Sequence, residues 1–181
     1  MKKDGFTLIE LLVTVVVLAI VTAITIPGFA RWLPDYRLRR AARDVYSNMQ
    51  LAKMSSVRNN ATWAIVFDTG ANRYLVCSED GVDNDWTTTG DNTTEKTVNL
   101  SDYGNSIQYG HGSATIAIPG GGFPADDVSF GSNVAVFNSR GFLNPPSGYV
   151  YLSNSKNNSF GIGSLTSGVS LLRRWDGAAW E

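Results

Sequence analysis

The chain has 181 residues, with 15 basic and 16 acidic side chains and a formal net charge of −1 at pH 7. This balance gives no global reason to expect a nucleic-acid-binding protein. A single cysteine, Cys77, excludes an intramolecular disulfide, and a single histidine, His111, excludes a metal site built from several histidines. Because no recognisable nucleophile motif is present either, we expect no enzyme.

An apolar run from Phe6 to Ile26 opens the chain and contains one carboxylate, Glu10. As a helix this run spans roughly 30 Å, the thickness of a bilayer's hydrocarbon core. Lys2 and Lys3 precede it, so we expect them on the cytoplasmic side and the bulk of the chain across the membrane. An acid in such a span is costly without a partner, which makes Glu10 a candidate functional residue. A cleaved secretory signal and a plain anchor, with Glu10 reaching the interface, are the alternatives.

The string KKDGFTLIELLV resembles the processing signal of type IV prepilins and type II secretion pseudopilins. In that family a prepilin peptidase cuts after the glycine, here Gly5, and methylates the new amino terminus, here Phe6. The family's glutamate falls on Glu10, and its proline near the end of the apolar run falls on Pro27. The resemblance implies that Glu10 of one subunit neutralises the Phe6 amine of its neighbour, a pair that is strong only when both charges are present.

The same resemblance implies a location and a set of partners. We expect the precursor in the bacterial inner membrane as a single-pass protein with its globular domain in the periplasm, and later in a periplasmic or surface filament. Its partners would be prepilin peptidase, the inner-membrane assembly platform, the membrane and other pilin or pseudopilin subunits. Residues 1–5 would be the cleaved leader and residues 6–27 the transmembrane and filament-core helix.

Residues 28–60 are expected to continue this helix as an amphipathic segment. The stretch GFARWLP (28–34) contains Gly28 and Pro34, which predicts a kink or a loosened turn. From residue 35 to 57, small and apolar side chains recur every three or four positions and predict one buried seam. That seam consists of Leu38, Ala42, Val45, Met49, Ala52 and Ser56.

Four basic side chains lie mostly off this seam: Arg39, Arg40, Arg43 and Lys53. A solvated helix face is the simplest interpretation. Contacts with acidic groups on neighbouring subunits come next, and nucleic acid or lipid head groups are the least favoured partners.

Residues 61–181 predict a β-rich globular domain, because short β-like runs alternate with Gly, Asn, Asp and Pro. Expected strands cover residues 62–68, 73–78, 96–100, 106–109, 114–118, 128–130, 134–138, 149–153 and 169–175, the first two forming a hairpin. Cys77 is expected to be buried on a strand. A long N-terminal helix packed on an antiparallel sheet-rich domain predicts an α+β fold, and the resemblance to prepilins implies a pilin fold. The helix sequence, WAIVFD, RYLV and the pattern of Phe137, Gly141 and Gly148 resemble the GspH/FimT branch of pseudopilins and minor pilins.

Two local features could carry further chemistry. The acidic loop after residue 78 offers oxygen ligands, with Asp80, Asp83 and Asp85 as calcium candidates, although its spacing departs from the EF-hand template and favours a solvated loop. We therefore expect no cofactor, with calcium as the alternative. Arg173 and Arg174 could contact DNA or a partner, but the G-R-x-R motif of DNA-binding relatives is absent; packing of Trp175 with exposed arginines is favoured.

The sequence thus predicts a structural subunit, a GspH/FimT-like minor pilin or pseudopilin of a type IV pilus or type II secretion pseudopilus. Two alternatives stay open. The chain could be a major pilin of a fibre for adhesion or motility, or a DNA-binding minor pilin that serves DNA uptake.

Overall fold

The computed structural model describes residues 6–144 and 146–181, apart from the side chains of residues 26, 27 and 30, and divides into two compact units. Unit 1 ends at Leu33, and unit 2 comprises Pro34–Glu181. Gly5 lies outside the described residues, so the expected cleavage site is described only from Phe6 onward.

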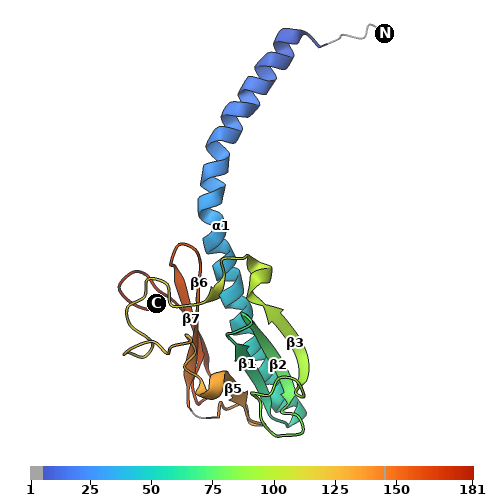
Figure 1. The fold of residues 1–181 in the computed structure, drawn as a ribbon, viewed down its shortest axis with the longest axis vertical. Helices are drawn as coiled ribbons and strands as arrows, with labels where there is room; N and C mark the ends of the chain where they lie inside the picture. Colours follow the sequence, from blue (N-terminus) through green and yellow to red (C-terminus); the bar gives the residue numbers. More distant parts are fainter. Residues whose placement is uncertain (1–5, 145) are drawn as a thin grey trace. The chain divides into compact units, whose positions relative to one another are not determined.

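A single helix, α1 (Leu8–Asn59), belongs to both units (Figure 1). It forms the helix that the structure describes in unit 1 and continues as the first element of unit 2. It is helical through Pro27, Gly28 and Pro34, so the loosened stretch expected at 28–34 is wrong. A proline removes one backbone donor and crowds one carbonyl, and the intact hydrogen bonds on either side can still carry the helix past it.

The predicted seam is confirmed, because all six of its side chains are buried. Leu38, Val45 and Met49 contribute its largest apolar groups to the main core of unit 2. The exposed face of the same helix carries Arg39, Arg40 and Arg43.

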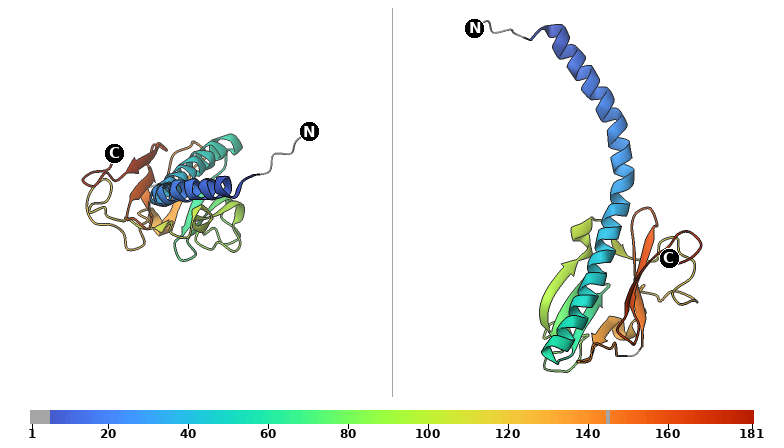
Figure 2. Two further views of the ribbon diagram at one scale, coloured as in Figure 1. Left: turned by 90° about the horizontal axis from the view of Figure 1, so that it is seen from above. Right: turned by 180° about the vertical axis from the view of Figure 1, so that it is seen from behind.

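Two four-stranded antiparallel sheets complete unit 2. The first has the order β3-β2-β1-β5, from β1 (Trp63–Asp68), β2 (Arg73–Glu79), β3 (Thr93–Asn99) and β5 (Val134–Phe137). The second has the order β4-β6-β7-β8, from β4 (Gln108–Tyr109), β6 (Gly148–Ser153), β7 (Ser159–Ser164) and β8 (Ser170–Arg174). Two short 3-10 helices, η1 (Leu100–Tyr103) and η2 (Gly131–Asn133), precede β4 and β5. Within unit 2, β1–β3 lie to one side of the helix and β6–β8 to the other (Figure 2).

Alternation along the strands assigns their two faces. In β1, Trp63, Ile65 and Phe67 enter the main core with α1, whereas Ala64 and Val66 face a second apolar cluster. Trp86, from the β2–β3 connection, packs against that second cluster. The connection is therefore more than a solvated loop, because it covers the outer face of the first sheet.

Strand β7 was not predicted, although it lies in the interior of its sheet and all its residues are buried. Its sequence, SFGIGS, has the glycines and serines of a loop. In the sheet, Gly161 and Gly163 pair with Tyr151 and Tyr149 of β6, and a Cβ on either glycine would crowd the ring opposite. The glycines make room for these rings, a known way of accommodating strand glycines.

Two other expected strands are wrong. Residues 114–118 form a loop, because the Ile118 N–H donates to the Tyr151 hydroxyl and the Ala117 N–H to the Gly121 carbonyl instead of to a strand. Residues 128–130 contribute only an isolated bridge, Val128 to Val150. Cys77 is confirmed as buried on a strand, β2.

Candidate functional sites: assembly helix and charged surfaces

The first turn of α1 holds the predicted assembly residue, Glu10. Thr7 precedes the helix, and its hydroxyl accepts a hydrogen bond from the Glu10 backbone N–H at 3.3 Å. Thr7 and Glu10 thus occupy the two ends of an S/T-x-x-E capping sequence. A negative charge here also faces the positive end of the helix dipole. The structure therefore shows a local reason for an acid at this position, beside any contact with another chain.

The helix around Glu10 carries apolar side chains on all of its sides. Residues Leu8–Thr25 are long and apolar enough to cross a bilayer. Every described side chain from Phe6 to Thr25 is exposed, among them Leu8, Ile9 and Leu18. Exposed apolar surface of this extent belongs against lipid or against the helices of other chains. Thr14, Thr22 and Thr25 satisfy their hydroxyls on carbonyls of the preceding turn, which lowers the cost of such burial.

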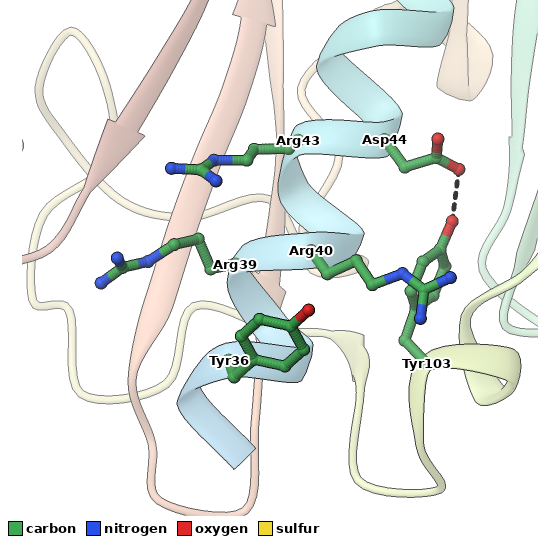
Figure 3. Close-up of a pocket in the computed structure, with 6 residues that line it drawn as sticks. All are labelled: Tyr36, Arg39, Arg40, Arg43, Asp44 and Tyr103. Carbon is green, nitrogen blue, oxygen red and sulfur yellow. Dashed lines mark hydrogen bonds between the residues drawn. The ribbon is translucent and has the colours of Figure 1, made fainter. Parts of the chain in front are cut away.

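A groove of about 370 Å³ lies at the start of unit 2 and is lined by basic and aromatic side chains (Figure 3). We call it the arginine groove; its residues are Tyr36, Arg39, Arg40, Arg43, Asp44 and Tyr103. All but Tyr103 come from α1, where positions three and four apart share a face. The helical pattern singles out the three arginines but not Tyr103, which η1 brings to the helix over a long separation in the chain.

Asp44 anchors this groove to the first sheet. Its carboxylate accepts hydrogen bonds from the hydroxyls of Tyr103 and, at 3.2 Å, of buried Tyr74. Asn48 donates to the Tyr74 hydroxyl at 2.6 Å and accepts from Lys96 at 3.1 Å. Burial and then the Asp44 charge raise the pKa of Tyr74 far above its ordinary value, so it stays neutral. Asp44 is thus already engaged within the chain, in contrast to the arginines beside it.

The calcium candidates Asp80, Asp83 and Asp85 lie in the β2–β3 connection. Asp83 accepts the Asp85 N–H, and Asp85 accepts both the N–H and the hydroxyl of Thr87. Within residues 6–144 and 146–181, no three carboxylate, histidine or cysteine side chains gather as a metal site. These carboxylates therefore shape their own loop.

Arg173 and Arg174 are exposed neighbours on β8. Consecutive strand residues point to opposite faces of a sheet, so the two guanidinium groups do not form one patch. Arg173 lines a shallow cavity with Trp180, which donates from its indole N–H to the Ile116 carbonyl at 2.7 Å. Trp175 is buried against Trp180, as the packing interpretation predicted.

His111, the single histidine of the sequence, contacts an acid and an aromatic ring from a neighbouring loop. Its Nδ1 lies 2.5 Å from an Asp127 carboxylate oxygen, and its ring stacks on Phe123 at 4.0 Å between centroids. This contact ties two loops on the outer side of the second sheet. Nothing in the local sequence pattern signals it, because the partners come from separate loops.

Comparisons with known proteins agree with this architecture. Residues 1–26 match the family model of the prokaryotic N-terminal methylation motif, and residues 41–168 match that of type II transport protein GspH. A search of curated proteins finds no match to the sequence.

Two solved structures resemble the chain. The type IV minor pilin FimU of Pseudomonas aeruginosa aligns with a TM-score of 0.54 and 8% identity, over 81% of this chain and 94% of that one. The minor pseudopilin EpsH from the Type 2 Secretion System of Vibrio cholerae aligns with a TM-score of 0.49 and 10% identity, over 75% of this chain and 95% of that one. At such identities the FimU alignment supports the fold alone.

Proposed function

This chain belongs to the type II transport protein GspH family and is a GspH-like pilin or pseudopilin subunit, and we propose that it is made as a precursor, cut between Gly5 and Phe6, and polymerised from the inner membrane. The observation that supports the proposal is that two features occur together in one chain. An N-terminal methylation motif is continuous with an exposed apolar helix, and that helix enters a GspH-type domain. Its work is structural and mechanical.

In this proposal, prepilin peptidase removes residues 1–5 on the cytoplasmic face and methylates Phe6. The globular unit lies in the periplasm, and unit 1 leaves the lipid for the core of a filament. Its exposed apolar side chains support this step, because they can exchange lipid for neighbouring helices at little cost in solvation. The new amine at Phe6 supplies the opposite charge that Glu10 needs in a nonpolar setting.

We favour a minor subunit, which initiates or caps a filament, over a major pilin, because the matched family is that of GspH. Filaments purified with this chain as their dominant subunit would overturn that choice. DNA uptake is the weaker alternative. Arg173 and Arg174, the candidate DNA contacts, lie on opposite faces of β8, so they cannot both contact the same phosphate backbone.

Processing is tested by replacing Gly5 with valine in cells that hold prepilin peptidase. The branched side chain should block the close approach of the enzyme to the backbone, so Gly5→Val should leave full-length precursor in the membrane. Mass spectrometry of the N-terminal peptide is the readout, and the unaltered chain should begin at methylated Phe6.

Gly28→Val is the matched control, because a Cβ at Gly28 meets no atom within 4 Å. It should be processed as efficiently as the unaltered chain. Mature protein beginning at Phe6 in the Gly5→Val variant would contradict the proposed processing.

A further inference from the structure

The arginine groove holds positive charge that the chain does not balance. Arg39, Arg40 and Arg43 are exposed, and in the part of the chain that the structure describes none of them takes part in an ion pair. Asp44 also lines the groove, but Lys96 lies 3.8 Å from its carboxylate, which in addition accepts from two tyrosine hydroxyls. The charge of Asp44 is therefore balanced from β3, and the arginines keep theirs.

The three guanidinium groups are arranged to receive an acid from outside the chain. Arg39 and Arg43 are four positions apart and extend to the same side of α1, where like charges repel (Figure 3). Arg40 extends to the other side and lies over the Tyr103 ring, 5.6 Å from its centroid. This stacking orders the Arg40 guanidinium and leaves its N–H donors available. A carboxylate bound between Arg39 and Arg43 would remove their repulsion.

We propose that the arginine groove binds an acidic segment of a different, non-identical subunit of the same filament. That segment presents carboxylates to Arg39 and Arg43 on one side of the groove and to Arg40 on the other. Guanidinium groups bind carboxylates through paired hydrogen bonds of defined geometry, so the contact also fixes the orientation of the partner. This contact rests on the proposed function and specifies the partner that the minor subunit meets.

Two observations favour a different chain as the partner over a second copy of this one. The acids of the β2–β3 connection already accept hydrogen bonds within their own loop, Asp83 from the Asp85 N–H and Asp91 from the Val82 N–H. A contact between the groove and acids of the same chain would also repeat from copy to copy and build a long homopolymer. A contact with a different subunit does not repeat, so it suits a chain that initiates or caps a filament.

Phosphate groups of lipids or nucleic acids also bind guanidinium groups, but carboxylates fit the proposed function better. A bilayer phosphate would be lost when unit 1 leaves the lipid, whereas a subunit contact has to persist in the filament. A nucleic-acid backbone needs a long row of cations, and the chain has a net charge of −1. Exposed ion pairs are individually weak, so the contact needs several of them together and should weaken in salt.

The test uses a carbodiimide, which joins a lysine amine to a carboxylate in contact with it. Arg39→Lys and Arg43→Lys are introduced together into the full-length chain, so the groove keeps its charge and gains two reactive amines. Cells that assemble the filament are treated, and the cross-linked peptides of the purified chain are identified by mass spectrometry. The ion pair of Lys156 with Asp35, 3.2 Å apart within the chain, shows that the reagent has worked.

The matched control is Arg140→Lys, which places a lysine at an exposed arginine outside the groove. The groove lysines should be joined to an aspartate or glutamate of another chain that itself begins at a methylated residue. A second variant carries Arg39→Glu and Arg43→Glu. Its recovery in sheared filament fractions should fall about tenfold, because like charges then face the partner. The amount of adduct at position 140 should be about tenfold lower than in the groove, since no opposed charge draws an acid to it.

An adduct between the groove and a second copy of this chain would overturn the proposal. So would the absence of any adduct at positions 39 and 43 in samples where Lys156 and Asp35 are joined. Normal recovery of the Arg39→Glu, Arg43→Glu variant in filament fractions would also overturn it. If that variant at the same time loses binding to phosphatidylglycerol vesicles or duplex DNA, the ligand of the groove is a phosphate.

N-terminal analysis of the same samples separates this contact from the proposed function. Unprocessed chains count against the proposed function. Chains that are processed and begin at methylated Phe6, but form no adduct in the groove, count only against the contact.

Discussion

The side-chain amide of Asn158 donates to the carboxylate of Asp35, with 2.6 Å between Nδ2 and Oδ1. Asp35 is the second residue of unit 2, and Asn158 lies in the turn between β6 and β7. Asn154 adds a second hydrogen bond at 2.9 Å, and Lys156 adds an ion pair at 3.2 Å. The helix is thus fastened to the second sheet where unit 2 begins.

This fastening should be sensitive to acid. Burial opposes ionisation of Asp35, but hydrogen bonds from Asn158, Asn154 and Lys156 outweigh it and hold the pKa below the ordinary 3.8. The contribution to stability is therefore fully present above pH 3.8 and is lost as the pH falls through the lower folded value. Asp35→Asn should cost about 1 kcal/mol at pH 7, a modest figure because the side chain is partly exposed.

The measurement is urea unfolding of the full chain in detergent, followed by tryptophan fluorescence at pH 7 and pH 3. The variant should lose less stability than the unaltered chain between these pH values. Asp102→Asn, an exposed acid of η1, serves as the control. Equal acid sensitivity in the Asp35 variant and the unaltered chain would count against the fastening.

Tyr74→Phe should destabilise unit 2 by about 1–3 kcal/mol, because buried Asn48 loses the partner of its side-chain N–H. The pH dependence has the opposite sign from that of Asp35. The pKa of Tyr74 is raised above its ordinary 10.0, so its contribution is present below pH 10 and falls away above it, where the unfolded chain ionises. Denaturant unfolding at pH 8 and 11 should show reduced alkaline sensitivity in the variant. Tyr46→Phe is the matched control, and identical alkaline loss in Tyr74→Phe would refute the assignment.

Gly168→Ala should be more damaging than Gly177→Ala, although both glycines have positive φ, +73° and +109°. A Cβ at Gly168 would overlap the Gly141 carbonyl oxygen, whereas one at Gly177 meets no atom within 4 Å. Lys53 of α1 also donates to the Gly168 carbonyl at 2.9 Å, which holds the turn between β7 and β8 against the helix. We expect a difference of about 2 kcal/mol in unfolding free energy. Equal effects of the two substitutions would mean that the loop moves aside freely.

Glu10→Gln should leave processing intact and impair assembly. The substitution keeps the shape of the side chain and the backbone N–H that Thr7 caps, so helix initiation is preserved while the charge is lost. Mass spectrometry should find methylated Phe6, and sheared filament fractions should contain little of the variant. Thr7→Ala, which removes the cap and keeps the carboxylate, separates the two roles. Normal incorporation of Glu10→Gln would remove the proposed pairing with the Phe6 amine.

Sequence patterns alone determined the parts of this protein that depend on local periodicity. The seam from Leu38 to Ser56 follows from helical spacing, and the hairpin of β1 and β2 follows from apolar strands around a short turn. The motif around Phe6 and Glu10 is contiguous in the chain, so it could be found without coordinates. The α+β pilin fold is confirmed on these grounds together with the family and structural matches.

The tertiary structure decided everything that joins distant residues. Gly161 and Gly163 belong to a strand only because Tyr151 and Tyr149 lie across from them, and no window around the glycines contains those rings. The arginine groove needs Tyr103 beside α1. The β2–β3 connection is positioned by Trp86, which packs on the outer face of the first sheet. Periodicity encodes which face of an element is buried; which elements meet there is settled by the packing of the whole core.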